Sequence, residues 1–334
     1  MIPVMFFTAI AFSNARNTSL IARRSLYLKN SGQFSDRGAV RESENQFVLA
    51  ERALFPFGRV QPKAKPFLKW AGGKTRLLRI LRRAVPNGFN RYFEPFLGGG
   101  ALFFDLAPRV AILSDSNSDL ILCYRVVRDS SEALLEQLTQ LRVSETEFYR
   151  MRSTNPSSLS DIERAARFIY LNKTCYNGVY RVNKNGDFNT PFGHYKKVAL
   201  VDPTNISRVS GALRGATLRS SDYQAVLLDA QPKDFIYLDP PYMPTGRYSD
   251  FKRYTKEFFH EADHERLAEL FKSLVSRGCF VLLSNSYHER IAHLYSAFRQ
   301  LKVQVPRFVN CKGEGRGAVT ELLISNYEIS RDAA

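Results

Sequence analysis

The chain has 334 residues, of which 44% are hydrophobic, and its formal net charge is +16. This length and composition predict a globular protein with one large core or two modest ones, and they exclude a fibrous or wholly disordered chain. The surplus of Lys and Arg favours a polyanionic partner, because it raises the potential that attracts phosphate backbones.

Residues 1–62 differ in composition from the rest of the chain. The segment is rich in Ser, Thr and basic residues and has no acidic residue before Asp36. Such a pattern is typical of a transit peptide, or of an apolar signal without the usual cleavage site. The alternative is an upstream start codon that adds a disordered leader. We therefore leave this segment out of the fold prediction.

From Phe67 onward, helical and strand patterns alternate. The segment KTRLLRILRRAV, residues 74–85, places Leu77, Leu78, Leu81 and Val85 on one helical face and ends before Pro86. Five short apolar runs predict strands at residues 91–96, 109–115, 234–239, 279–285 and 321–327. Because these runs are apolar on both faces, they favour a mainly parallel sheet covered by helices, an α/β fold.

The alternation stops between Asp129 and Asp222, where the sequence becomes helical, polar and rich in Gly and Asn. We expect one domain from residues 63–128 and 219–330, interrupted by an inserted module at 129–218. Basic and aromatic residues interleave within the insert, and the dipeptide Asn185-Gly186 favours a hairpin turn with positive φ at both positions. A basic hairpin of this kind is suited to a DNA groove, where an arginine can pair with guanine.

A glycine cluster follows the predicted strand at 91–96. The sequence EPFLGGGALFF places Gly98, Gly99 and Gly100 between a strand and a helix, where backbone N–H groups can approach a ligand closely. The next predicted strand ends at Asp115, the position of the carboxylate that accepts ribose hydroxyls in α/β nucleotide sites. Together these features predict a ligand that contains adenosine.

Two common adenosine ligands fit this pattern poorly. A dinucleotide fingerprint requires a small residue where Phe103 stands, and a phosphate-binding loop ending in GGKT requires glycine where Leu68 stands. The sequence therefore disfavours NAD and ATP.

The apolar run FIYLDPPY ends in an aspartate, two prolines and a tyrosine. We expect Asp239 to face the crevice beyond the strand ends, held by the stiff turn of Pro240 and Pro241. A carboxylate and the Pro240 carbonyl can each accept one hydrogen of an exocyclic amine, which stabilises the charge that develops on its nitrogen. Tyr242 offers a flat face on which an extruded base can stack.

Other catalytic classes find little support. His260 to His264 read HEADH and match the zinc motif HExxH, but His260 is expected at or before a helix start and no later ligand follows at a suitable distance. The cysteines form no CxxC pair; they are Cys123, Cys175, Cys279 and Cys311. We therefore expect neither a metal nor a disulfide framework. No apolar run reaches the roughly 18 to 20 residues that span a bilayer.

Five motifs, in this order, resemble the Dam-type DNA adenine-N6 methyltransferases: FLKWAGGK (67–74), FEPFLGGGALFF (93–104), SDSNSDLI (114–121), YNGVYRVNKNGDFNTPFGHYK (176–196) and YLDPPY (237–242). The resemblance covers about residues 65–327. It implies a Rossmann-like methyltransferase sheet, S-adenosylmethionine as the methyl donor, and methylation of a flipped adenine in duplex DNA, with GATC as the expected target.

The resemblance also implies roles for individual residues. The expected catalytic residues are Asp239, Pro240, Pro241 and Tyr242. The expected contacts of the methyl donor are Trp70, Lys74, Phe96, Gly98, Gly100, Asp115, Asp222 and Asp239. The expected DNA contacts are Lys69, Arg181, Pro191, Tyr195, Arg307 and Arg316. The loop before the last strand, with Cys311 and Glu314, departs from the family's usual polar sequence.

Two alternatives stay open from the sequence. One is methylation of cytosine N4 or of a base in RNA, which Asp239 disfavours because Ser or Asn often precedes PPY in those relatives. The other is a DNA-binding module without activity. We expect a monomer acting on double-stranded DNA in a bacterial cytoplasm, without membrane attachment, with a restriction endonuclease as a candidate partner and a targeting role for the leader left open.

Overall fold

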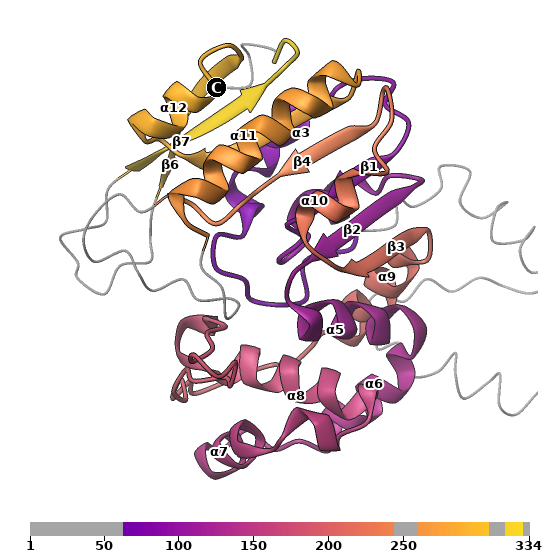
Figure 1. Cartoon of the computed structure of the whole chain (residues 1–334). Helices are drawn as coiled ribbons and strands as arrows, with labels where there is room; N and C mark the ends of the chain where they lie inside the picture. Colours follow the sequence, from indigo (N-terminus) through magenta and orange to yellow (C-terminus); the bar gives the residue numbers. More distant parts are fainter. Residues whose placement is uncertain (1–62, 244–258, 307–317, 330–334) are drawn as a thin grey trace, which may run out of the picture. The chain divides into compact units, whose positions relative to one another are not determined.

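A computed structural model describes residues 63–243, 259–306 and 318–329 (Figure 1), which belong to the compact unit Pro62–Ala334. The expectations for residues 1–62 lie outside the described residues.

Within the described residues, strands β1 to β7 form one sheet in the order β3-β2-β1-β4-β5-β7-β6. The strands are β1 (Tyr92–Glu94), β2 (Ala111–Asp115), β3 (Ala216–Ser220), β4 (Phe235–Leu238), β5 (Phe280–Ser286), β6 (Arg299–Pro306) and β7 (Ala318–Ser325). The five strands from β3 to β5 pair in parallel, whereas β7 pairs antiparallel with both β5 and β6. The predicted α/β fold with a mainly parallel sheet is confirmed.

The central strands are buried on both faces. In β1, Tyr92 packs into one core and Phe93 into the other, and in β4 the same alternation separates Tyr237 from Ile236. One core is covered by α3 (Leu78–Ala84), α4 (Ala101–Leu106) and α5 (Ser118–Asp129), and the other by α10 (Tyr223–Leu227), α11 (Glu261–Ser276) and α12 (Glu289–Leu294). Figure 1 shows α10, α11 and α12 together on one face of the sheet. The helix predicted from Lys74 begins as a short 3₁₀ turn, Lys74–Arg76, before α3.

Four further helices follow α5 along the chain: α6 (Ser131–Thr139), α7 (Glu145–Ser153), α8 (Asp161–Thr174) and α9 (Pro203–Leu213). Ser160 starts α8 with a capping box, in which its side chain accepts from the Glu163 N–H while Glu163 accepts from the Ser160 N–H. Helix α5 packs against both α8 and α9, and α6, α7 and α8 gather to one side of the sheet (Figure 1). The bounds 129–218 for an insert stay a prediction, although β3 begins at Ala216 and pairs with β2 before that end.

The predicted hairpin forms after α8, with an antiparallel bridge between Val182 and Phe188. Its turn differs from the prediction, because φ is positive at Gly186 (90°) and not at Asn185. The Gly186 N–H donates to the Asn183 carbonyl, and the Asn183 side chain accepts from the Asn185 and Asp187 N–H groups. The Asn183 side chain therefore stabilises a longer loop in which a single left-handed glycine suffices.

Candidate active site

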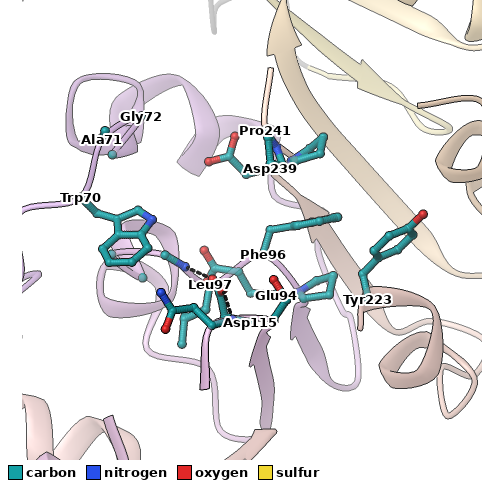
Figure 2. Close-up of a pocket in the computed structure, with 18 of the residues that line it drawn as sticks. Trp70, Ala71, Gly72, Glu94, Phe96, Leu97, Asp115, Tyr223, Asp239 and Pro241 are labelled. Carbon is teal, nitrogen blue, oxygen red and sulfur yellow. Dashed lines mark hydrogen bonds between the residues drawn. The ribbon is translucent and has the colours of Figure 1, made fainter. Parts of the chain in front are cut away.

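A cavity of about 580 Å³ opens beyond the carboxyl ends of β1, β2 and β4. This volume lies within the range of roughly 300 to 1,000 Å³ typical of small-molecule sites. The cavity brings together all residues that the sequence predicted for catalysis or for the methyl donor, namely Trp70, Lys74, Phe96, Gly98, Gly100, Asp115, Asp222, Asp239, Pro240, Pro241 and Tyr242. In Figure 2, Asp239 and Asp115 lie on opposite sides of this space, with Phe96 and Glu94 between them.

Asp115, at the end of β2, is tied to the glycine loop. Its Oδ2 accepts from the Gly98 N–H and its Oδ1 from the Asn117 N–H, each at 3.0 Å. Burial raises the pKa of Asp115, and these two hydrogen bonds oppose the increase. Each carboxylate oxygen can accept a further hydrogen bond. The arrangement therefore fits a ligand that presents hydroxyl groups, such as a ribose.

The glycine loop lies against the indole of Trp70. Gly98 has φ of 46°, and a Cβ at this position would come within 2.7 Å of Trp70 Cδ1. Glycine is required here both by the left-handed backbone and by the close approach of the ring. Trp70 also stacks on Tyr180, with ring centroids 5.8 Å apart.

Asp239 follows β4 directly and is held by two side chains from other segments. Lys74 Nζ lies 2.7 Å from its Oδ2, and Ser284 Oγ donates to its Oδ1 at 2.9 Å. Lys74 is buried, donates also to the Gly72 carbonyl, and lies 4.7 Å from the centroid of the Tyr242 ring. Lys74 was expected only as a contact of the methyl donor, and the structure shows that it also contacts the Asp239 carboxylate.

Tyr242 closes the same end of the cavity. Its hydroxyl donates to Glu321 Oε2 on β7 at 2.8 Å. Burial is the main cause of a pKa well above the usual value for this phenol, and the charges of Asp239 and Glu321 add to it. The phenol is neutral, and its hydrogen bond to Glu321 orients the ring.

Glu94 is a cavity residue that the sequence analysis missed. It ends β1, is 3% exposed, and its Oε2 accepts from the Tyr92 hydroxyl at 2.9 Å. Burial raises its pKa to about 8, and the charge of Asp239 acts in the same direction. An acidic residue at a strand end directly before the glycine loop, as in FEPFLGGG, was the signal for it.

Asp222 and Phe96 lie toward another part of the cavity. Asp222 caps α10 by accepting from the Gln224 N–H at 2.8 Å, and its side chain is exposed. The rings of Phe96 and Tyr223 stack with centroids 5.1 Å apart. This part offers a flat apolar surface beside a carboxylate, which fits the base of an adenosine.

The hairpin after α8 also forms part of the cavity wall. Tyr180, Val182 and Gly186 line the cavity, although the sequence analysis assigned this segment only to DNA. Tyr180 and Val182 are buried and alternate with Arg181, which does not line the cavity. The alternation in VYRV predicts that Tyr180 and Val182 are buried on one face, but it does not predict that this face lines the cavity.

The structure brings together some of the predicted DNA contacts. Lys69 Nζ lies 4.4 Å from the centroid of the Tyr195 ring and donates to the Lys173 carbonyl. Arg181 donates to the Asn189 side chain at 2.7 Å. Pro191 is exposed. Arg307 and Arg316 lie outside the described residues.

The HEADH segment is part of a helix terminus. His260 precedes α11 as its N-cap, as predicted, and Asp263 accepts from the His260 N–H. His264 is buried with its ring edge-on to Phe259 at 4.8 Å. Across residues 63–243, 259–306 and 318–329, no three His, Cys, Asp or Glu side chains gather as a metal site. No helix in those ranges is long and apolar enough to cross a bilayer.

Comparison with known proteins gives consistent matches. Residues 70–307 match the family described as D12 class N6 adenine-specific DNA methyltransferase. A type II methyltransferase of Lactococcus lactis subsp. cremoris is 42% identical over 271 residues, covering 79% of this chain and 95% of that protein. A type II methyltransferase of Methanocaldococcus jannaschii is 40% identical, covering 79% and 100%. The DNA adenine methylase of Escherichia coli strain K12 is 34% identical, covering 78% and 95%.

Proposed function

Since the chain belongs to the D12 class of N6 adenine-specific DNA methyltransferases, we propose that Asp239 and the Pro240 carbonyl receive the amino group of its target adenine. Membership of this family makes the protein an adenine-specific DNA methyltransferase that uses S-adenosylmethionine. It also decides against the alternatives of cytosine N4 or RNA methylation, whereas the alternative of an inactive DNA-binding module is tested by equilibrium dialysis with S-adenosylmethionine.

The observation that carries the proposal is the position of Asp239. Its carboxylate lies at the end of β4, in the cavity that also holds Asp115 and the glycine loop. The residues fit the methyl donor: Asp115 would accept its ribose hydroxyls and Phe96 and Asp222 would flank its adenine, while Trp70 lies against the glycine loop. S-adenosylmethionine supplies an electrophilic methyl group on a positively charged sulfur.

The chemistry assigned to the chain is positioning and charge stabilisation. Asp239 and the Pro240 carbonyl accept the two amine hydrogens, Pro241 stiffens the turn, and Tyr242 stacks the base. Transfer would form a bond between N6 and the methyl carbon, break the carbon–sulfur bond with its electron pair passing to sulfur, and release one proton from N6, which Asp239 could accept. Because the leaving group is a neutral thioether, we propose that transfer requires no metal.

The finer assignment is the target sequence. We propose GATC, read by Arg181 together with Lys69, Pro191 and Tyr195. The support is that Arg181 lies on a basic hairpin and its guanidinium is oriented by Asn189, a geometry suited to pairing with guanine. A restriction endonuclease as partner, a monomeric state and DNA association in a bacterial cytoplasm remain part of the proposal.

The test is the pattern of methylation in cells that lack adenine methylation. Expression of the protein should place N6-methyladenine in GATC, and modified adenine in another sequence would reject that target. Asp239→Ala should abolish transfer while leaving duplex binding near that of the unmutated protein. Retained turnover in this variant would reject the assignment of Asp239.

A further inference from the structure

The Asp239 carboxylate has a donor on each oxygen, and one of them comes from a residue outside every motif identified in the sequence. Lys74 pairs with Oδ2 at 2.7 Å, and Ser284 Oγ donates to Oδ1 at 2.9 Å. Ser284 is fully buried on β5 and does not line the cavity. Its hydroxyl therefore reaches the cavity only through Asp239.

The sheet explains why Ser284 meets Asp239. Strand β5 runs parallel to β4 with Leu283 opposite Leu238, so the next residues, Ser284 and Asp239, are neighbours. Strand β4 ends at Leu238, whereas β5 continues to Ser286 and pairs with β7 on its other side, Ser284 opposite Leu323. Ser284, within a strand that is paired on both sides, thus holds Asp239, which lies just beyond the end of β4.

The hydrogen bonds around Ser284 have one direction. A charged carboxylate only accepts, so the Ser284 hydroxyl gives its single proton to Asp239. The Tyr237 hydroxyl, 2.9 Å from Ser284 Oγ, must then be the donor in that contact. Tyr237 is 1% exposed. The chain of donors runs from Tyr237, which itself lines the cavity, through Ser284 to Asp239, and the side chains of Tyr237 and Ser284 are both buried.

We propose that Ser284 is a positioning residue for methyl transfer, which holds the Asp239 carboxylate at the rotation that receives the target amine, with Tyr237 orienting Ser284 in turn. The inference rests on the proposed role of Asp239. A carboxylate that can rotate about its side-chain bonds spends less time aligned with the amine, and misplacement of about 1 Å can cost about 100-fold in rate. Because Asp115, Phe96, Asp222 and the glycine loop also line the donor cavity, binding of the methyl donor and of DNA depends far less on this rotation than transfer does.

The experiment compares three substitutions at one position. Ser284→Ala removes the donor, Ser284→Thr keeps the hydroxyl on a side chain suited to a strand, and Ser284→Cys keeps the shape but weakens the donor. In single-turnover assays, Ser284→Ala should lower the transfer rate by about 10- to 100-fold, with Thr near the unmutated rate and Cys in between. The Kd for S-adenosylmethionine and for duplex DNA should change by less than about twofold in each.

Ser325 provides the matched control. It is fully buried on the neighbouring strand β7, and its hydroxyl donates to the Tyr327 carbonyl, away from Asp239. Ser325→Ala therefore removes a buried serine hydroxyl from the same sheet and should leave the transfer rate unchanged. An equal loss of rate in both alanine variants would mean that general packing is responsible, and would overturn the proposal.

Tyr237→Phe tests whether the two hydroxyls act in series. This variant alone should slow transfer by a smaller factor, and Tyr237→Phe combined with Ser284→Ala should be no slower than Ser284→Ala alone, because Tyr237 acts through Ser284. If the fold losses in transfer rate of the two single variants multiply in the double variant, the proposed order from Tyr237 through Ser284 to Asp239 is overturned. If Asp239→Ala is inactive while Ser284→Ala transfers at the full rate, only this inference fails. If Asp239→Ala remains active, the proposed function of Asp239 fails instead.

Discussion

Replacing Glu94 by Gln tests whether the Glu94 carboxylate stabilises the positively charged sulfur of the methyl donor. Burial raises the pKa of Glu94 to about 8, so it is mostly protonated at neutral pH. The methyl carbon on the sulfonium has to lie within about 3 to 3.5 Å of an amine held by Asp239, so the charged sulfur is one bond further away, and Asp239 is close enough for its charge to raise the pKa of Glu94. A cation bound there should favour the ionised form of Glu94.

The expected magnitude follows from that pKa. With a pKa of about 8, about one Glu94 carboxyl in ten is ionised at pH 7 and about nine in ten at pH 9. If the donor binds the ionised form, its affinity rises by about tenfold between these two pH values. In Glu94→Gln, the amide cannot ionise and this increase should disappear.

The assay is isothermal titration calorimetry with S-adenosylmethionine and S-adenosylhomocysteine at several pH values. The two ligands share the adenosine and the titrating amino group, and only the first carries a charged sulfur, so the ratio of their affinities isolates the sulfonium. This ratio should rise with pH in the unmutated protein and stay level in Glu94→Gln. A level ratio in the unmutated protein, or the same rise in both proteins, would refute the coupling.

Three further outcomes follow from the geometry. Between about pH 4.5 and 8 the folded protein binds more protons at Glu94 than the unfolded chain does, so its free energy of unfolding should fall as pH rises through this range. In Glu94→Gln, the free energy of unfolding measured by denaturation should change less with pH over the same range. Gly98→Ala brings a Cβ within 2.7 Å of the Trp70 ring at a φ of 46°, and it should weaken S-adenosylmethionine binding in calorimetry, whereas Gly211→Ala, in open space, should not. Arg167 is buried and donates to the Met151 and Arg152 carbonyls at the end of α7, so Arg167→Ala should lower the free energy of unfolding in urea by about 2 kcal/mol.

The sequence predicts the central strands well because they are apolar on both faces. Strands β1, β2, β4 and β5 lie in the middle of the sheet, and each falls in a short run that is mostly apolar. Strands β3 and β6 form the two edges and were missed. Their segments ATLRS and RQLKVQVP alternate polar with apolar residues, so they lack that signal. Edge position, which depends on tertiary packing, decides whether a strand shows a hydrophobic run.

The candidate site divides in a similar way. Asp115, the glycine loop and Asp239 were predictable because each stands at a strand end, and strand ends of a parallel sheet meet at one edge. The contacts among Lys74, Asp239 and Ser284 were not predictable from local pattern, since they join segments far apart in the chain. The same holds for the inner face of the hairpin, because the end of α8 determines where in the fold this face lies and therefore which cavity it lines.

If the hairpin after α8 reads the target sequence, as proposed, its place in the cavity wall limits how that target could change. Tyr180 and Val182 face the cavity, and Arg181 between them does not. Tyr180 also stacks on Trp70, which covers the glycine loop. Exchange of the whole hairpin for one with another specificity would therefore also remove part of the cavity wall. New specificities would then be reached by changing residues such as Arg181, which alternate with the cavity-lining Tyr180 and Val182.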